Sequence, residues 1–274
     1  MNYRHHFHAG NFADLVKHAL WLELLRRAKA GPGPITVIDT HAGAGMYDLM
    51  GDAARRSGEA EQGIVRLMAD ADAPPVFDPL KAVVRRLNPD GGVRLYPGSP
   101  ALTLGALGRG DRYEGCELRP DDQAALGALL AETRTGVEAQ ALRVDGYARL
   151  AAARPGKGRL LALIDPPFEQ ADDYRRIIET TSRSAAETTA VWLPLKDLET
   201  FDAFIEGLET KGARGFVVEV RLRPLSDPMK MNGCAVAVLG RGAAGLEVDA
   251  LAIGGWVAAT GGGAGAARIV GLAG

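Results

Sequence analysis

Residues 35–45, ITVIDTHAGAG, decide the fold of this chain. The run ITVID (35–39) is short, apolar and β-branched, which is typical of a buried strand. Asp39 ends the run, and Gly43 and Gly45 follow in a turn where the backbone can approach a ligand closely. In parallel α/β sheets, ligands with a ribose or a phosphate bind at such a turn, beyond the carboxyl end of the strand.

The turn does not fit two common nucleotide-binding motifs. A P-loop needs Gly-Lys-Ser/Thr, which is absent, so binding of a nucleoside triphosphate is not expected. The dinucleotide fingerprint G-x-G-x-x-G fails because Asp48 stands where the third glycine would be, which argues against a nicotinamide dehydrogenase. An acid followed by G-x-G suits a cofactor without a pyrophosphate, such as S-adenosyl-L-methionine. The same short pattern also occurs in ordinary tight turns.

From residue 99 onward, helical and strand patterns alternate. Helices are predicted at 11–29, 100–108, 121–133, 146–153, 171–186 and 197–210. Strands are predicted at 35–39, 112–117, 141–145, 159–164, 189–193, 215–222 and 234–239. The alternation predicts an α/β fold with a mostly parallel, seven-stranded sheet that is covered on both faces. The last two strands follow each other directly, which predicts a hairpin and hence one antiparallel strand.

Residues 46–98 interrupt this alternation, because helical patches separated by Pro/Gly turns replace most strand signals there. We therefore predict an inserted helical subdomain at 46–98. The main domain is predicted from 1–45 and 99–274, and its first 30 residues hold an N-terminal motif and a helix. The tail 259–274 is rich in Gly and Ala, a composition that is compatible with disorder.

The composition limits the class of protein. A chain of 274 residues with 47% hydrophobic and 24% charged residues is long enough for one large domain, or for one domain with an insertion. Cys116 and Cys234 cannot form a disulfide framework, and no signal peptide or membrane-spanning run is visible, so a cytoplasmic location is predicted. The formal net charge of −2 gives no global attraction for nucleic acid, so an RNA partner requires a local patch. All five histidines lie in the first 41 residues, but no further ligand follows at metal-binding spacing, and no metal is predicted.

Polar residues stand at the ends of the next predicted strands. Glu117 in YEGCELRP can accept hydrogen bonds from the two hydroxyls of a ribose. Asp145, followed by Gly146, can accept from the amino group of an adenine. Ser99 in YPGSP is either a helix N-cap or a cofactor contact. Structural interpretations compete with these: an acid at a helix start for Glu117, and a turn for Asp145.

The stretch LIDPPFE (163–169) ends another predicted strand, because proline cannot donate to the ladder of a sheet. Methylation of an exocyclic amine on a base needs acceptors for its N–H groups, since the nitrogen lone pair is delocalised into the ring. Asp165 and the carbonyl of Pro166 are suited as acceptors, and Phe168 is suited to stack on the base. The two prolines keep these groups rigid. The competing interpretation is a strand-ending turn with a chance aromatic residue.

These residues resemble the amino-group methyltransferases that carry a [DNS]-P-P-[YFW] motif on a class I, Rossmann-like fold. The similarity to the RlmJ family rests on YRHHFHAGNFADLVKH (3–18), DTHAGAGMYDL (39–49), YPGSP (96–100) and IDPPFE (164–169). The resemblance covers nearly the whole chain in order, and the opening block is the most specific part. It implies methylation of N6 of a single adenine, adenine 2030, in bacterial 23S ribosomal RNA, with a helical subdomain inserted after the first strand.

The resemblance also implies roles for individual residues. Lys17 and His18 would contact the methionine end of S-adenosyl-L-methionine, with His41 beside it. The rest of the cofactor pocket would come from Gly43, Ser99, Glu117, Asp145, Gly146 and Asp165. Asp165 would be the catalytic residue that accepts the proton of the amine. Tyr3 would touch the substrate. Independently of the resemblance, Pro166 and Phe168 are expected to hold the flipped-out base, and Arg4 is a candidate cation for binding RNA. Phe168 replaces the commoner Tyr of this motif without losing the stacking face.

The expected partner is 23S ribosomal RNA, free of protein or at an early stage of assembly, and the expected state is a monomer without membrane contact. A DNA adenine-N6 methyltransferase or a protein glutamine-N5 methyltransferase would use a similar motif. A non-catalytic protein that binds RNA or a cofactor is an alternative from a different class. With a formal net charge of −2, affinity for RNA is expected to depend on a few cations near the site.

Overall fold

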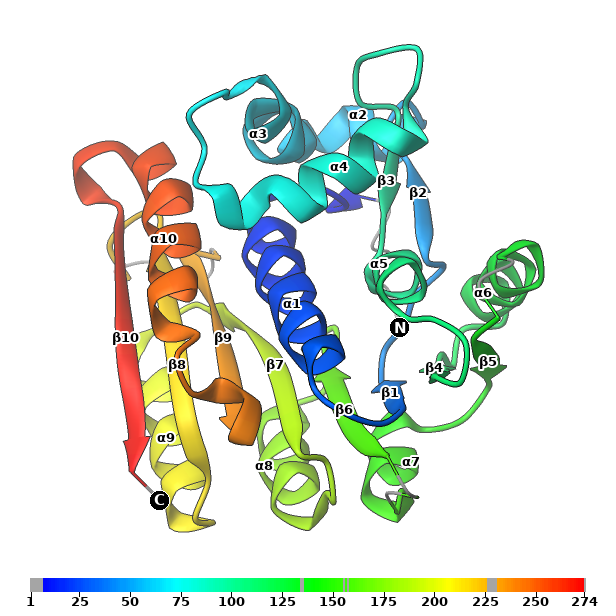
Figure 1. Cartoon of the computed structure of the whole chain (residues 1–274). Coiled ribbons are helices and arrows are strands. Elements are labelled where there is room, and N and C mark those ends of the chain that lie inside the picture. The colour runs from blue at the N-terminus through cyan, green and yellow to red at the C-terminus, as the bar shows by residue number, and fades with distance from the viewer. Residues whose placement is uncertain (1–6, 134–135, 155, 157, 226–230, 274) are drawn as a thin grey trace.

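The computed structural model describes residues 7–133, 136–154, 156, 158–225 and 231–273. Within these ranges the main sheet consists of eight strands in the order β10-β8-β9-β7-β6-β1-β4-β5 (Figure 1). The strands are β1 (Ile35–Asp39), β4 (Arg112–Cys116), β5 (Glu138–Leu142), β6 (Arg159–Ile164), β7 (Thr188–Leu195), β8 (Arg214–Arg221), β9 (Gly233–Gly240) and β10 (Ala266–Ala273). No helix in the described ranges is long and apolar enough to cross a membrane.

Strand β1 lies inside the sheet, and its carboxyl end marks the edge of the sheet at which the predicted site residues lie. It runs parallel to β4 on one side and to β6 on the other, and Asp39 is opposite Gly115 and Leu163. The carboxyl ends of the three strands therefore meet at one edge of the sheet. The residues that follow these strands, including Glu117 and Asp165, are brought close together by this register.

The predicted α/β class is confirmed, and the sheet is larger than expected. The first seven strands form the predicted sheet, in which β9 is antiparallel to β7 and β8. An eighth strand, β10, adds to the edge of the sheet by antiparallel pairing with β8. The Arg268 side chain on β10 donates to Glu219 on β8 at 2.6 Å.

Two local predictions are wrong. Residues 266–273 of the tail are not disordered, because they form a strand that pairs with β8, and this strand carries the β-branched Ile269 and Val270 within the Gly/Ala-rich tail. The strand predicted at 141–145 is found at Glu138–Leu142. Its chain leaves the sheet earlier because Asp145 caps the next helix, accepting a hydrogen bond from the amide of Ala148.

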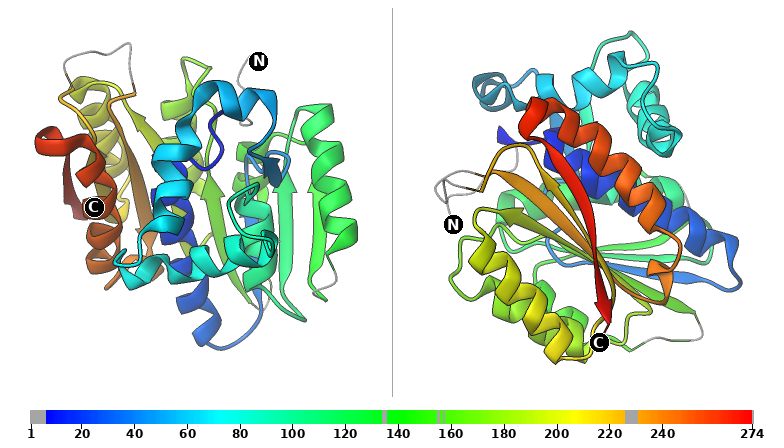
Figure 2. Two further views of the ribbon diagram at one scale, coloured as in Figure 1. Left: turned by 90° about the horizontal axis from the view of Figure 1, so that it is seen from above. Right: turned by 90° about the vertical axis from the view of Figure 1, so that its left-hand side faces the viewer.

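Helices cover both faces of the sheet. The helices outside residues 46–98 are α1 (Phe12–Ala30), α5 (Ser99–Ala106), α6 (Pro120–Glu132), α7 (Gly146–Ala152), α8 (Asp173–Arg183), α9 (Leu198–Thr210) and α10 (Glu247–Ala258), with 3-10 turns η4 (Arg241–Ala243) and η5 (Ala259–Ala264). Helices α1, α5 and α10 lie on one face, and α7, α8 and α9 lie on the other (Figures 1 and 2). The sheet is therefore the middle layer of three, as its apolar strands require.

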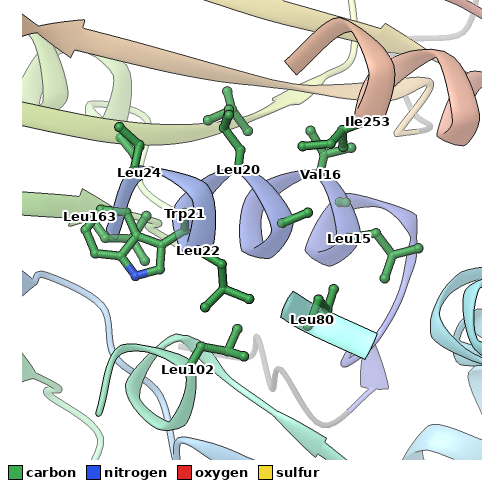
Figure 3. Packing of buried hydrophobic residues seen from close by; sticks show 14 of the residues in the cluster. Leu15, Val16, Leu20, Trp21, Leu22, Leu24, Leu80, Leu102, Leu163 and Ile253 are labelled. Carbon is green, nitrogen blue, oxygen red and sulfur yellow. The ribbon is translucent and has the colours of Figure 1, made fainter. Parts of the chain in front are cut away.

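Helix α1 is the most deeply buried of the helices that carry site residues. Its side chains from Ala13 to Leu25 are all buried. Figure 3 shows them directed to several neighbours, with Leu163 from the sheet, Leu102 from α5 and Ile253 from α10 around the helix. Asn11 caps its start by accepting hydrogen bonds from the amides of residues 13 and 14. The core thus fixes α1, and with it the charged residues on its first turns.

Residues 46–98 are mainly helical and begin and end in a two-stranded ribbon. Their elements are β2 (Met46–Asp48), α2 (Asp52–Ser57), η2 (Glu61–Val65), α3 (Arg66–Ala69), η3 (Pro75–Phe77), α4 (Asp78–Leu87) and β3 (Leu95–Pro97). Strands β2 and β3 pair antiparallel. The segment is attached to α10, because the Trp256 indole donates to Asp70 at 2.7 Å and lies under the Arg66 guanidinium. The division into two domains remains a prediction.

Candidate functional site

A cavity of about 380 Å³ opens at the carboxyl edge of the sheet. It has the size of a small-molecule site. Ten of the residues predicted for the site line it: Lys17, His18, His41, Gly43, Ser99, Glu117, Asp145, Gly146, Asp165 and Pro166. The structure therefore brings together the ends of β1, β4, β5 and β6 with the first turns of α1.

The glycine turn after β1 forms one wall of the cavity. Gly43 and Gly45 have φ angles of 62° and 81°, in the left-handed region that favours glycine. A Cβ atom on Gly43 would lie 2.5 Å from the Tyr47 hydroxyl. The Gly43 amide instead donates to Glu117 Oε2 at 3.0 Å, which ties the turn to the end of β4.

Glu117 presents a carboxylate at the end of β4. Besides the Gly43 contact, Oε1 accepts a hydrogen bond from the Arg119 amide at 2.8 Å. Burial raises the pKa of Glu117 above its usual value, while these backbone donors act in the opposite direction. Each carboxylate oxygen has a further lone pair, so the group can still accept from the hydroxyls of a ribose.

Ser99 is not a helix N-cap, because Gly98 occupies that position and Ser99 is the first residue of α5. Its hydroxyl donates to Asp39 Oδ2 at 2.7 Å. Asp39 is fully buried, and burial raises its pKa to about 6. Ser99 therefore lines the cavity and also holds one oxygen, Oδ2, of the carboxylate that ends β1.

Asp145 and Gly146 join the end of β5 to α7. Asp145 caps α7, and its Oδ2 accepts a hydrogen bond from Arg176 of α8 at 2.5 Å. Burial alone would raise the pKa of Asp145, but the Ala148 amide and Arg176 outweigh it and lower the pKa. Gly146 packs directly on the β1 turn, since a Cβ there would lie 2.0 Å from the Thr40 carbonyl oxygen.

His41 lies between the glycine turn and α7. Its ring meets the edge of Tyr147 at a centroid distance of 4.9 Å, and its Nδ1 is 2.8 Å from the Thr40 hydroxyl. Burial lowers the pKa of His41 to about 4, so the imidazole is neutral at pH 7. A neutral ring suits contact with a cofactor better than it suits binding of a phosphate.

Lys17 is engaged by two carboxylates of the protein. Its Nζ lies 2.9 Å from Asp14 Oδ1 and 2.5 Å from Asp165 Oδ2. Burial acts to lower the pKa of Lys17, but the two carboxylates outweigh it and raise the pKa well above its usual value. The neighbouring His18 directs Nδ1 to the Tyr96 hydroxyl at 2.8 Å. Both residues line the cavity, and Lys17 also holds Asp165, the residue predicted to accept a proton.

The residues of the DPPF stretch point in different directions, some into the cavity and one away from it. Asp165 and Pro166 line the cavity, whereas the Phe168 ring packs against Tyr174 and Trp192 at centroid distances of 4.9 and 5.7 Å. Phe168 has a φ of 50°, which is uncommon for a residue with a side chain. Its ring lies outside the lining of the cavity, so stacking on a base remains a prediction. Tyr3 and Arg4 lie outside the described residues.

Three residues at the site were not predicted: Tyr147 and Arg176, which line the cavity, and Asp14, which contacts Lys17 without lining it. Tyr147 directly follows Asp145 and Gly146, so its position in the sequence was a usable signal. Asp14 stands three residues before Lys17, the spacing at which helical side chains meet. Arg176 carried no signal, because it reaches Asp145 from α8, 31 residues along the chain. Its guanidinium also lies 4.3 Å from the centre of the Tyr147 ring.

The chemistry of the cavity wall is that of a site for a nucleoside with a charged side chain. Carboxylates at Glu117 and Asp145 are hydrogen-bond acceptors, and the glycine turn allows close approach. Lys17 and Asp165 lie at the α1 side of the same cavity. Among the described residues there is no cluster of three or more His, Cys, Asp or Glu side chains that could hold a metal ion.

Known proteins are similar to this chain in sequence and in fold. The family model described as "Ribosomal RNA large subunit methyltransferase D, RlmJ" matches residues 33–270. The chain is 34% identical over 245 residues to "Ribosomal RNA large subunit methyltransferase J" of Escherichia coli, and the match covers 87% of this chain and 86% of that protein. The protein of the same name from Haemophilus influenzae is 32% identical over 247 residues, with the same coverage of 87% and 86%. A crystal structure of a Legionella pneumophila protein aligns with a TM-score of 0.87 at 25% identity, over 97% of this chain and 99% of that one. The chain therefore belongs to the RlmJ family of methyltransferases, which confirms the predicted family and, with it, S-adenosyl-L-methionine as the cofactor.

Proposed function

We propose that this protein transfers a methyl group from S-adenosyl-L-methionine to N6 of an adenine in 23S ribosomal RNA. One observation carries the proposal: Asp165, which directly follows β6 in the DPPF stretch, lines the same cavity as the glycine turn after β1. An acceptor for an amine and a site for the methyl donor are thus adjacent. The names of the relatives, which are ribosomal RNA large subunit methyltransferases, support RNA as the substrate.

The residues of the cavity fit the cofactor. Glu117 and Asp145 line the cavity; Glu117 would accept from the ribose hydroxyls and Asp145 from the adenine amino group, while Gly43 would let the backbone approach. Lys17 and His18 lie at the α1 side, where the methionine part would be held. When bound, S-adenosyl-L-methionine supplies an electrophilic methyl group, whose bond to sulfur breaks as a nitrogen attacks it.

The residues beyond β6 would hold the target adenine. Asp165 and the carbonyl of Pro166 are suited to accept the two N–H groups of the amine, which directs the nitrogen lone pair toward the methyl donor. The base must leave its stack to reach this cavity, as bases do in other enzymes that modify them. Phe168 is next to the acceptors in sequence, and its ring would need to leave its packing on Tyr174 and Trp192 to cover the base.

Proton transfer follows attack by the amine. The amino group of neutral adenine is too weak an acid for a carboxylate to deprotonate first, so N6 forms its bond to carbon and becomes acidic in the process. Asp165 then accepts the proton that N6 loses. Lys17, at 2.5 Å from Asp165 Oδ2, holds this carboxylate in one orientation.

Transfer of labelled methyl groups to defined nucleic acids tests the proposal. Protein-free 23S ribosomal RNA should be labelled, the product should be N6-methyladenosine, and mapping should place it at one position, adenine 2030. Asp165→Asn should reduce the rate by at least about 100-fold, because it keeps the shape of the side chain but cannot accept a proton.

Parallel reactions separate the alternatives. Labelled duplex DNA with unlabelled RNA would identify a DNA adenine methyltransferase, and label on the glutamine amide of a protein would identify a glutamine-N5 methyltransferase. Either result, or an Asp165→Asn variant that works at the parent rate, would refute the proposed reaction.

A further inference from the structure

We propose that Asp14 is a positioning residue for methyl transfer: it holds the Lys17 ammonium and shares its charge, so that Asp165 remains an effective proton acceptor. This inference rests on the proposed function. It starts from a buried row of three charged groups. The Lys17 side chain is 5% exposed and lies between Asp14, which is 3% exposed, and Asp165, which is 18% exposed.

Because Asp14 and Asp165 share the Lys17 ammonium, Asp165 feels less of its positive charge. Both carboxylates contact one nitrogen, so their nearest oxygens are within about 5.5 Å of each other. A carboxylate that has an ammonium to itself is a weak base, because the positive charge stabilises its ionised form. The second carboxylate offsets part of that charge. Asp14 thereby allows Lys17 to orient Asp165 without removing the basicity that the reaction needs.

Asp14 is itself held in place. Its Oδ2 accepts a hydrogen bond from the Gly10 amide at 2.9 Å. The Gly10 carbonyl in turn accepts from the amide of Ile64 in the 46–98 segment at 2.8 Å. Asp14 therefore uses one oxygen for the backbone before α1 and the other for Lys17, and neither contact can be kept if the carboxylate swings away.

Other titratable groups act on Asp165 and must stay constant in a test. Asp39 of β1, His41 of the glycine turn and Cys234 of β9 all interact with it electrostatically. At pH 7 His41 is neutral, and the Cys234 thiol is protonated because burial raises its pKa to about 12. Asp39 ionises in the range of the assay. Variants at residue 14 leave these three side chains in place.

Asp14 also acts electrostatically on Cys234, His8, Glu59 and Tyr96, and its Oδ1 lies 3.9 Å from His18 Nε2. Each variant is therefore also compared in a His8→Gln background, where the difference should persist if it comes from Asp165.

The test is the pH dependence of kcat for transfer of labelled methyl groups to 23S ribosomal RNA. Asp14→Asn removes the charge with little change of shape. We expect the acid limb of the profile to move to lower pH by roughly one unit, as expected for loss of one charge at this range. We expect kcat on the plateau of the profile to fall about tenfold, because a weaker base loses part of the roughly 100-fold or larger rate gain that a general base contributes. Asp14→Glu keeps the charge and should return the limb toward its position in the parent.

Asp111→Asn is the matched control. Asp111 is as buried as Asp14, and it also accepts from a lysine, Lys29, and from backbone amides, at the opposite end of the sheet. Its loss should lower the midpoint of urea unfolding without moving the pH profile. Asp14→Ser provides a second variant without the charge if Asp14→Asn fails to fold.

The outcomes separate this inference from the proposed function. If the parent transfers no methyl group to adenine N6, the proposed function fails and the inference fails with it. If the parent is active and the folded Asp14 variant without charge keeps the pH profile of the parent, only the inference is overturned. A shift of the same size in Asp111→Asn would also overturn it, because the effect would then not depend on the cluster.

Discussion

The close contact between Gly146 and the β1 turn allows a test of whether the walls of the cavity are rigidly packed. A Cβ atom at Gly146 would lie 2.0 Å from the carbonyl oxygen of Thr40 and 2.6 Å from its Cα. Both partners are backbone atoms of cavity walls, so neither can rotate away. To reach the shortest contact that real Cβ atoms tolerate, the start of α7 must move from the β1 turn by about 1 Å. Gly146→Ala therefore separates Asp145 from His41.

The magnitude follows from that displacement. Overpacking of this kind costs roughly 1–3 kcal/mol of unfolding free energy. A misplacement of about 1 Å in a site reduces catalysis by roughly 100-fold. We expect Gly146→Ala to lower the rate of methyl transfer by about this factor and to bind S-adenosylhomocysteine more weakly than the parent in calorimetry, while urea unfolding still shows a cooperative transition.

Gly127→Ala is the control for this substitution. Gly127 lies inside α6, and no atom is within 4 Å of the position of an added Cβ. Alanine favours a helix interior by about 1 kcal/mol over glycine, so this variant should be slightly more stable than the parent and bind the cofactor equally well. If Gly146→Ala bound S-adenosylhomocysteine as tightly as Gly127→Ala does, the β1 turn and the start of α7 would not be rigidly packed, and the reasoning would be refuted.

Four further outcomes are expected. Trp256→Ala should lower the free energy of unfolding by about 3 kcal/mol, because the indole packs on Phe77 and lies under Arg66; urea unfolding checks this. Burial raises the pKa of Cys116 and of Cys234 to about 12, so both thiols should react with a chromogenic disulfide at pH 8 only after unfolding; fast labelling of the native protein would contradict their burial. The lowered pKa of His41, about 4, means that the unfolded chain alone binds this proton between pH 4 and 6.5, so His41→Gln should weaken the loss of stability on acidification. The raised pKa of Asp39, about 6, has the opposite sign, so Asp39→Asn should remove a fall in stability as the pH rises from about 4 to 6; thermal unfolding across this range measures both.

The strand ends were predictable from the sequence because they follow a local rule. A short apolar run that stops at an acid and a glycine or proline marks the carboxyl end of a parallel strand, and these ends meet at one edge. Asp39, Glu117 and Asp165 were identified in this way. The cavity unites Glu117 and Asp165 with the residues of α1, whereas Asp39 is buried and contacts the cavity only through Ser99. Lys17 and His18 came from the resemblance instead, because nothing local relates α1 to the end of β6.

Features that depend on distant partners were not predictable. Strand β10 contains the strand-forming pair Ile269 and Val270, but Gly and Ala surround them in the sequence, and the strand takes its place in the sheet from pairing with β8, 45 or more residues earlier in the chain. Arg176 reaches Asp145 only because α8 packs beside α7. The position of the Phe168 ring depends on a backbone φ of 50°, at which the ring packs on Tyr174 and Trp192. No residue propensity predicts such an angle for phenylalanine.

The site and the core are not independent along α1, because the same buried helix contributes to both. A buried ammonium is tolerated only where carboxylates compensate it, so Lys17 requires Asp14 and Asp165 for α1 to lie where it does. In return, packing of α1 on the sheet, α5 and α10 sets the position of the Lys17 nitrogen, and through it the orientation of Asp165 (Figure 3). A core substitution that shifts α1 should therefore reduce methyl transfer without changing any residue of the cavity, since Lys17 would move with the helix and no longer hold Asp165, the proposed proton acceptor.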